Sequence, residues 1–312
     1  MSILEKLNDR QKKAAEKIEG ALLILAGAGS GKTRTITYRI AHMIQELGIS
    51  PYKILAVTFT NKAAKEMKER VEDLIGEDGR RTMVSTFHSF GVRLLRTYGD
   101  RLGYGANFTI YDADDQKRVV KGIMKELVVK DKNLTEGMVV SLISKLKEEE
   151  ISADEYEKSE NKYNMNAVVV AEIYRRYNIT LKNNNGMDFS DILINTAKLL
   201  EIPDILNKVQ DKFRYIMVDE YQDTNTAQFR LIHLLASTKG DNGETLHNLC
   251  VVGDDDQSIY RFRLADPTIF LGKYRAFADY TRAAEGEERR LILSRNFRSR
   301  PEVLEGANFV FR

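Results

Sequence analysis

Short runs of apolar, β-prone residues alternate with stretches in which apolar residues recur every three or four positions. In the first hundred residues the short runs occupy 21–25, 54–59 and 82–86, and the helical stretches that follow them occupy 33–47, 63–75 and 90–98. Two further runs, at 215–220 and 248–257, end in acidic or polar residues. Such alternation is typical of βαβ units, so we expect an α/β fold with a parallel sheet flanked by helices. Ligands of these sheets bind beyond the carboxyl ends of the strands.

The pattern changes between residues 107 and 186, where charged stretches with helical spacing of apolar residues dominate. We expect an all-helical insertion subdomain over this range. The α/β domain then comprises residues 1–106 and 187–278. An apolar run and a short helical stretch in residues 279–312 predict the start of a second, incomplete domain.

Composition bounds the class of protein. The chain has 312 residues, of which 43% are hydrophobic, enough for a sizeable core. Its 48 basic and 46 acidic residues give a formal net charge of +2, so any nucleic-acid surface must come from local clustering of charge. The single cysteine, Cys250, excludes an internal disulfide and is expected to be a small buried residue. Since no apolar run approaches the ~20 residues of a membrane span, we expect a cytoplasmic protein without membrane contacts.

A glycine-rich run, LAGAGSGKTRT, joins the first apolar run to the first helical stretch. Residues 26–33 match the P-loop pattern, with Ala26 where the strict pattern has glycine. In such a loop backbone N–H groups bind phosphates, Lys32 neutralises the β and γ oxygens, and the Thr33 hydroxyl binds Mg²⁺. The dipole of the following helix adds positive potential. A chance glycine turn is the alternative, which the strand before and the helix after disfavour.

Two acidic residues follow the apolar run YIMV. Asp219 at the strand end is a candidate second ligand for Mg²⁺. Glu220 points differently from Asp219 and could orient and deprotonate a water for attack on the γ-phosphate. This pair favours hydrolysis over transfer to another substrate and disfavours a small-molecule kinase. The alternative for Asp219 is a helix cap at a strand end.

Six motifs in order make the chain resemble a known family. They are GAGSGKT, LAVTFTNKAAKEM, STFHSFG, VDEYQDTN, VVGDDDQSIYRFR and NFRSRPEVL. Their order and spacing resemble those of superfamily 1 helicases of the UvrD/PcrA/Rep type over nearly all 312 residues. The resemblance implies a P-loop NTPase domain of the RecA-like class, and a second RecA-like domain beginning in 279–312. It also implies a 3′–5′ translocase on single-stranded DNA that uses ATP and Mg²⁺.

The resemblance assigns roles in nucleotide binding and hydrolysis. Gln11, in LNDRQKKAA, would read the adenine, and Phe297, where the family usually has Tyr, would stack on it. Gln257 would sense the γ-phosphate, Arg298 would act as an arginine finger, and Arg34 would assist at the phosphates. The residues expected to contact nucleotide or metal, or to act in catalysis, are Gln11, Ala26, Gly27, Ala28, Gly29, Ser30, Gly31, Lys32, Thr33, Arg34, Asp219, Glu220, Gln257, Phe297 and Arg298.

The resemblance also assigns DNA contacts. Aromatic faces stack on bases of any sequence, and arginines attract phosphates. The matching positions are Phe59, Thr60, Asn61, His88, Tyr260, Phe262 and Arg263. Taken singly, each aromatic residue is more often part of the core than a DNA contact. Arg261 and Leu264 depart from the glycines common in the family, so the family's local turn and its wedge geometry for bases do not carry over directly to these positions.

The end of the sequence affects the expected activity. Because Arg312 follows soon after Arg298, we expect most of the second motor domain to be missing and ATP hydrolysis by this chain to be weak. The expected partners are single-stranded DNA and single-strand/duplex junctions, and we expect a monomer. Two alternatives remain open. The chain could belong to a helicase–nuclease subunit of the RecB/AddA kind, or it could be a nucleotide-dependent DNA-binding module without useful turnover.

Overall fold

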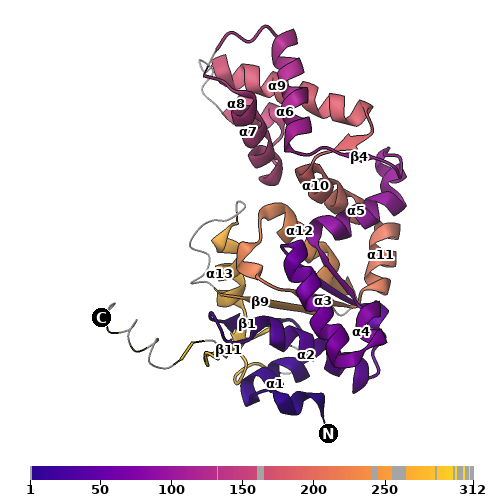
Figure 1. Ribbon diagram of the computed structural model, residues 1–312, viewed down its shortest axis with the longest axis vertical. Coiled ribbons are helices and arrows are strands. Elements are labelled where there is room, and N and C mark those ends of the chain that lie inside the picture. Colours follow the sequence, from indigo (N-terminus) through magenta and orange to yellow (C-terminus); the bar gives the residue numbers. More distant parts are fainter. Residues whose placement is uncertain are drawn as a thin grey trace. The chain divides into compact units, whose positions relative to one another are not determined.

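The computed structural model describes residues 2–131, 133–159, 165–239, 245–254, 265–284, 287–297, 299–300, 305 and 309. The chain forms two compact units (Figure 1). The first, which we call the sheet unit, comprises Met1–Phe87, Asn207–Thr224 and Leu235–Arg312. The second, the helical unit, comprises His88–Leu206 and Asn225–Leu234.

A sheet of seven strands forms the centre of the sheet unit. All its neighbouring strands are parallel. In order across the sheet, the strands are β10 (Ala278–Asp279), β11 (Arg289–Leu293), β1 (Leu22–Ala26), β9 (Leu249–Gly253), β6 (Tyr215–Val218), β2 (Ile54–Thr58) and β3 (Met83–Thr86). The predicted parallel α/β fold is therefore confirmed. A separate antiparallel pair joins β7 (Ser237–Lys239) to β8 (Thr245–His247).

Helices flank this sheet (Figure 1). They are α1 (Asp9–Glu16), α2 (Lys32–Gln45), α3 (Asn61–Ile75), α4 (Glu77–Arg81) and α13 (Pro267–Ala276). Alternate strand residues, such as Leu22 and Ile24, share one core cluster with apolar residues of α1, α2 and α3. Cys250 is buried in this cluster, as predicted, and burial raises the pKa of its thiol.

The last part of the sheet unit differs from the predicted domain boundary. Residues from 279 onward were expected to open a second domain, but β10 and β11 belong to the first sheet, where β11 pairs with β1. The apolar run in 289–293 indicates a strand, yet the pattern does not say which sheet receives it. Register settles this point, because Leu291 and Leu293 enter the same core cluster as Ile24 and Ala26.

The helical unit is larger than the predicted insertion of residues 107–186. Its helices are α5 (Phe87–Tyr98), α6 (Ala113–Glu126), α7 (Glu136–Glu148), α8 (Ala153–Ser159), α9 (Met165–Asn183) and α10 (Phe189–Leu200), and α11 (Pro203–Lys212) and α12 (Thr226–Ala236) cross the division between the units. A short pair joins β4 (Thr109–Ile110) to β5 (Gly186–Met187). A core cluster from α6, α7 and α9 fills its centre. Helix α10 joins this unit because it packs closely on α5, where a Cβ at Gly91 would lie 2.6 Å from Thr196 Oγ1.

Candidate nucleotide-binding site

The glycine-rich loop lies between β1 and α2, with Ala26 at the end of the strand. Gly29 and Gly31 have φ of 75° and 86°, the left-handed region that glycine adopts without steric cost. Ser30 closes the turn, since its N–H and hydroxyl both donate to the Gly27 carbonyl, at 3.1 and 2.7 Å. Gly31 begins α2 without a side-chain cap from the described residues. The first N–H groups of α2 are thus available to an anion, the arrangement that the P-loop pattern predicts.

Lys32 occupies the first position of α2. Its side chain is 15% exposed, and Nζ lies 3.8 Å from Asp254 Oδ2, at the end of β9. Among the described residues Nζ has no hydrogen-bond partner. A buried ammonium without hydrogen bonds is costly, and phosphate oxygens at the loop would satisfy it. The residues present therefore fit a nucleotide phosphate group.

Thr33 and Asp219 meet although one follows the loop and the other follows β6. The Thr33 hydroxyl donates to Asp219 Oδ2 at 3.1 Å. Burial, and next the charge of Glu220, raise the pKa of Asp219 to about 6. Hydroxyl and carboxylate oxygens are ligands that Mg²⁺ accepts, and a cation here would offset the buried negative charge. This pair fits a magnesium site.

Glu220 adopts a left-handed backbone conformation, with φ of 55° and ψ of 39°. This conformation costs a non-glycine residue roughly 1–2 kcal/mol. Its N–H donates to Asp219 Oδ1 at 3.0 Å. The 3₁₀ helix Tyr221–Asp223 begins directly after Glu220. Glu220 is half-buried, and its charge contributes to the raised pKa of Asp219.

Gln222 connects the ends of two strands. Its Oε1 accepts a hydrogen bond from the Asp254 backbone N–H at 3.1 Å, which holds the end of β9 beside the turn after β6. Sequence reasoning did not assign Gln222 or Asp254 to the site. Asp254 stands in the motif VVGDDDQSIYRFR and Gln222 in VDEYQDTN, so both motifs gave a signal, but neither showed that the two residues are hydrogen-bonded to each other.

Gln11 lies at the other end of the loop. It is buried, its Nε2 donates to the Ser30 carbonyl at 3.0 Å, and its Oε1 accepts from Asn8 N in a capping box. A cavity of about 250 Å³ opens beside it, lined by Asn8, Asp9, Arg10, Ser30, Leu293, Ser294 and Arg295. The structure therefore places Gln11 at the loop, next to a space where a base could lie.

The segment that contains Phe297 is bound to the same loop. Phe297 N donates to the Gly29 carbonyl at 2.9 Å, and Asn296 Nδ2 donates to the Ala28 carbonyl at 3.1 Å. The Phe297 side chain is 54% exposed and thus open to a stacking partner.

Arg34 contacts protein groups outside the phosphate-binding loop. Its guanidinium donates to the Lys6 carbonyl at 2.9 Å and covers the Tyr38 ring. Its phosphate role stays a prediction.

The expected DNA contacts that the structure describes fall in both units. Phe59 is buried edge-on against Phe87, while Thr60 caps α3, where Asn61 is exposed. His88 is in the helical unit, 5.7 Å from the Phe189 ring. The residues expected to act but lying outside the described part of the chain are Gln257, Tyr260, Phe262, Arg263 and Arg298.

Phe189 is an exposed aromatic residue that was not among the DNA contacts expected from the sequence. It begins α10 and is 50% exposed, with its ring inclined by 76° to that of His88. Apolar periodicity places a phenylalanine in a core by default, so its exposure became visible only in the fold.

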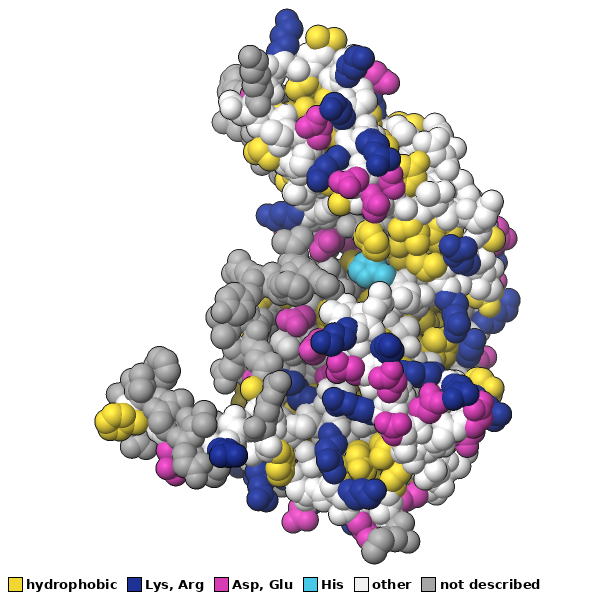
Figure 2. Space-filling model, in the orientation of Figure 1, with side chains coloured by type: hydrophobic (Ala, Val, Ile, Leu, Met, Phe, Trp, Pro, Cys, Tyr) yellow, Lys and Arg dark blue, Asp and Glu magenta, His cyan; other side chains and the backbone are white. Residues whose placement is uncertain are grey.

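Basic and acidic side chains of the described residues are mixed on the surface that Figure 2 draws. On the face drawn in Figure 2, Lys and Arg side chains lie among Asp and Glu side chains, in keeping with the small net charge. None of the described helices has the length and apolarity needed to cross a bilayer.

Comparison with known proteins agrees with this geometry. The chain matches the family described as UvrD/REP helicase N-terminal domain over residues 7–278. It is 44% identical over all 312 residues to proteins named ATP-dependent DNA helicase PcrA from Staphylococcus epidermidis and Staphylococcus aureus. The chain spans 40% of the length of these relatives. The resemblance seen in the motifs is confirmed, and the chain belongs to the UvrD/REP helicase family.

Proposed function

We propose that this chain is the amino-terminal ATPase part of a DNA helicase, which binds Mg-ATP and couples its hydrolysis to movement along single-stranded DNA. The observation that carries the proposal is that Lys32, Thr33 and Asp219 meet at one glycine-rich loop, with Glu220 next to Asp219. One of these side chains is an unsatisfied buried ammonium, and two others are oxygen ligands 3.1 Å apart. The names of the PcrA relatives support the same reading.

Each residue then has a separate task. The N–H groups at the start of α2 and the Lys32 ammonium bind and orient the β and γ phosphates. Thr33 and Asp219 hold Mg²⁺, which when bound neutralises charge on the phosphate oxygens. Glu220 orients a water in line with the γ-phosphorus and accepts its proton, so that ADP and inorganic phosphate are released.

The finer parts of the function are proposals of the same kind. We propose that Gln11 and Phe297 contact the base, and that Gln257 and Arg298 respond to the γ-phosphate. Single-stranded DNA and its junctions with duplex are the proposed partners of a monomeric, cytoplasmic protein. A His88–Phe189 surface in the helical unit offers aromatic faces to bases, which supports this choice.

The test is steady-state ATP hydrolysis with Mg²⁺, with and without single-stranded DNA, for the parent chain and Glu220→Gln. Glu69→Gln is the control, because Glu69 is an exposed side chain of α3 in the same unit. We expect Glu220→Gln to bind a fluorescent ATP analogue like the parent and to lose turnover by at least tenfold. Turnover at the parent's rate would remove Glu220 from the mechanism. A parent chain that binds nucleotide and DNA without measurable turnover would favour the binding-module alternative.

A further inference from the structure

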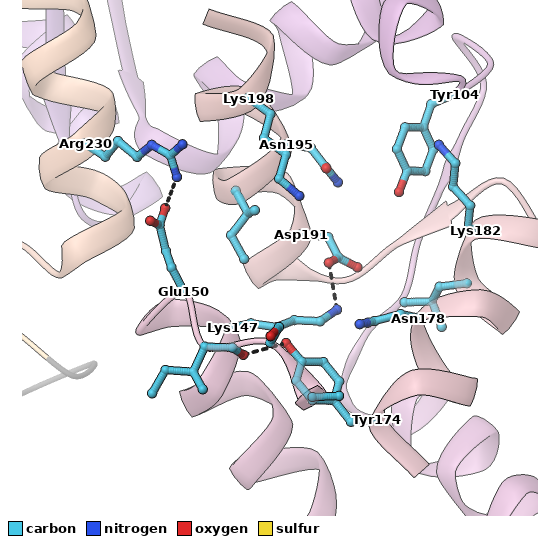
Figure 3. Close-up of a pocket in the computed structure, with 15 residues that line it drawn as sticks. Tyr104, Lys147, Glu150, Tyr174, Asn178, Lys182, Asp191, Asn195, Lys198 and Arg230 are labelled. Carbon is cyan, nitrogen blue, oxygen red and sulfur yellow. Dashed lines mark hydrogen bonds and ion pairs between the residues drawn. The ribbon is translucent and has the colours of Figure 1, made fainter. Parts of the chain in front are cut away.

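A second cavity, of about 460 Å³, lies inside the helical unit (Figure 3). Its wall is formed mainly by α9 and α10, by the residues around 150 and by Tyr104. These residues belong to one unit and none of them is part of the nucleotide-binding loop. Any function of this cavity is therefore separate from that of the nucleotide-binding loop.

The carboxylates of this cavity already have cationic partners. Asp191 accepts from Lys147 Nζ at 2.7 Å, and Glu150 pairs with Arg230 at 2.6 Å. Both pairs are drawn in Figure 3. Within the lining the charges of these four residues cancel, while Lys147 also pairs with Asp188 and Arg230 with Glu201, both outside the lining.

Two further lysines carry charge that is not matched in this way. Lys182 of α9 and Lys198 of α10 line the cavity, and within the described part of the chain neither forms an ion pair. Lys182 Nζ donates to the Leu102 carbonyl at 2.6 Å and lies 3.3 Å from the centre of the Tyr104 ring. Burial, and next the charge of Lys198, lower the pKa of Lys182. Two ammonium groups that repel each other at a cavity are stabilised by an anion between them.

Neutral donors complete the lining. Asn178 of α9 and Asn195 of α10 direct their side-chain ends into the cavity from different sides (Figure 3). Both amides also contact tyrosine hydroxyls, Asn195 that of Tyr104 and Asn178 that of Tyr174, and buried Asn195 has a further long contact of 3.8 Å from Nδ2 to Met187 Sδ. Amide N–H groups beside ammonium groups are the donors that phosphate oxygens accept.

We propose that this cavity binds a phosphate group between Lys182 and Lys198, with Asn178 and Asn195 as neutral donors. Its volume exceeds that of inorganic phosphate, so the group can arrive as a free small phosphate or as a phosphate of a nucleic-acid strand. The proposal is independent of the loop at Lys32 and of ATP hydrolysis.

The test uses the full 312-residue chain carrying Lys32→Ala, which removes the ammonium of the nucleotide loop. Brief acetylation of lysines is followed by mass spectrometry, with inorganic pyrophosphate, a short single-stranded oligonucleotide, or chloride at equal ionic strength. We expect Lys182 and Lys198 to be protected at least threefold by one of the two phosphate probes and not by chloride. Lys117 and Lys145 are internal controls, since both are exposed lysines of the same unit.

Binding of the protecting probe is then measured for two double variants. Lys182→Gln with Lys198→Gln should weaken binding at least tenfold, whereas Lys117→Gln with Lys145→Gln, which removes the same charge, should not. Protection by pyrophosphate alone identifies a free phosphate as the source, and protection by the oligonucleotide identifies a strand. Absence of protection by both probes, equal protection by chloride, or equal binding by the two double variants would overturn the proposal. If circular dichroism shows that a double variant does not fold, its two single variants are measured in its place.

Discussion

Replacing Lys147 by Met should destabilise the helical unit strongly. Lys147 is 3% exposed, and its Nζ lies 2.7 Å from both Asp188 Oδ2 and Asp191 Oδ1. Tyr177 also donates to Asp188 Oδ2, at 3.0 Å. Methionine matches the volume of the lysine stem, so the change removes the charge without opening a large cavity. It leaves two carboxylates without their cation, which for a broken buried ion pair costs about 3–5 kcal/mol.

The pH dependence of that loss follows from the pKa directions. Burial raises the pKa of Asp191, and the attraction of Lys147 opposes the rise. Without that attraction the native pKa rises further above the unfolded value of about 3.9. A native state that holds protons more tightly than the unfolded state gains stability as pH falls. The free energy of unfolding that Lys147→Met loses relative to the parent should therefore be larger at pH 8 than at pH 5.

Urea unfolding followed by circular dichroism, at pH 5 and at pH 8, measures the loss of unfolding free energy and its dependence on pH. Lys145→Met is the matched control, because its side chain is 52% exposed and pairs loosely with Glu149, so a change within about 0.5 kcal/mol is expected. Adding Asp188→Asn and Asp191→Asn to Lys147→Met should restore part of the stability, since Asn still caps a helix. A Lys147→Met variant as stable as the parent, or with the opposite pH trend, would refute the reasoning.

Four further outcomes are expected. Lys32→Ala should abolish tight Mg-ATP binding while circular dichroism stays unchanged, and a variant that hydrolyses ATP at the parent's rate would contradict the site. Gly31→Ala should lower the free energy of unfolding by about 1–3 kcal/mol, because φ is 86° and the new Cβ would lie 2.6 Å from Gln11 Nε2. Gly137→Ala, where the new Cβ has no neighbour within 4 Å, is the control, and a urea midpoint of Gly31→Ala equal to that of the parent would contradict the expected strain. Phe189→Ala should weaken single-stranded DNA binding measured by fluorescence anisotropy, by the ~1–3 kcal/mol of one stacked base, and unchanged anisotropy would remove Phe189 from the DNA surface. Chelation of Mg²⁺ should weaken binding of the fluorescent ATP analogue by at least tenfold, and equal affinity would argue against a metal at Thr33.

Local patterns predicted the parts of the site that are themselves local. The loop from Ala26 to Thr33 is a continuous segment whose glycines need left-handed angles, so its geometry follows from its own residues. Asp219 could be placed at a strand end because an apolar run precedes it. The rule that parallel strands end at one edge then predicted that it meets Thr33, and the structure gives a 3.1 Å hydrogen bond.

Other contacts between distant segments could not be predicted from those patterns. The pairing of β11 with β1 depends on which edge of the sheet is free, and hydrophobic spacing carries no such information. Phe59, which was expected to contact DNA, is buried, whereas Phe189, which was not, is exposed. Residue type could not distinguish the two phenylalanines, because exposure depends on what packs against each ring. The left-handed angle of Glu220 was also invisible in the sequence, since the tertiary structure imposes it on a residue that disfavours it.

The balance of charge at the loop refines what the sequence motif alone implies. A glycine-rich loop followed by lysine indicates an anion site, but at its Mg²⁺-binding side Lys32 lies near the carboxylates of Asp219 and Asp254, with Glu220 next to Asp219, while Arg10 and Arg295 line the cavity at Ser30 and Arg34 donates to the Lys6 carbonyl. Asp219 and Asp254 are about 5% exposed, so water screens their charges poorly. The phosphates of free ATP would add negative charge beside these poorly screened carboxylates. A divalent cation at Thr33 and Asp219 reverses that balance, and for this reason the geometry favours a nucleotide that arrives with its metal over the nucleotide alone.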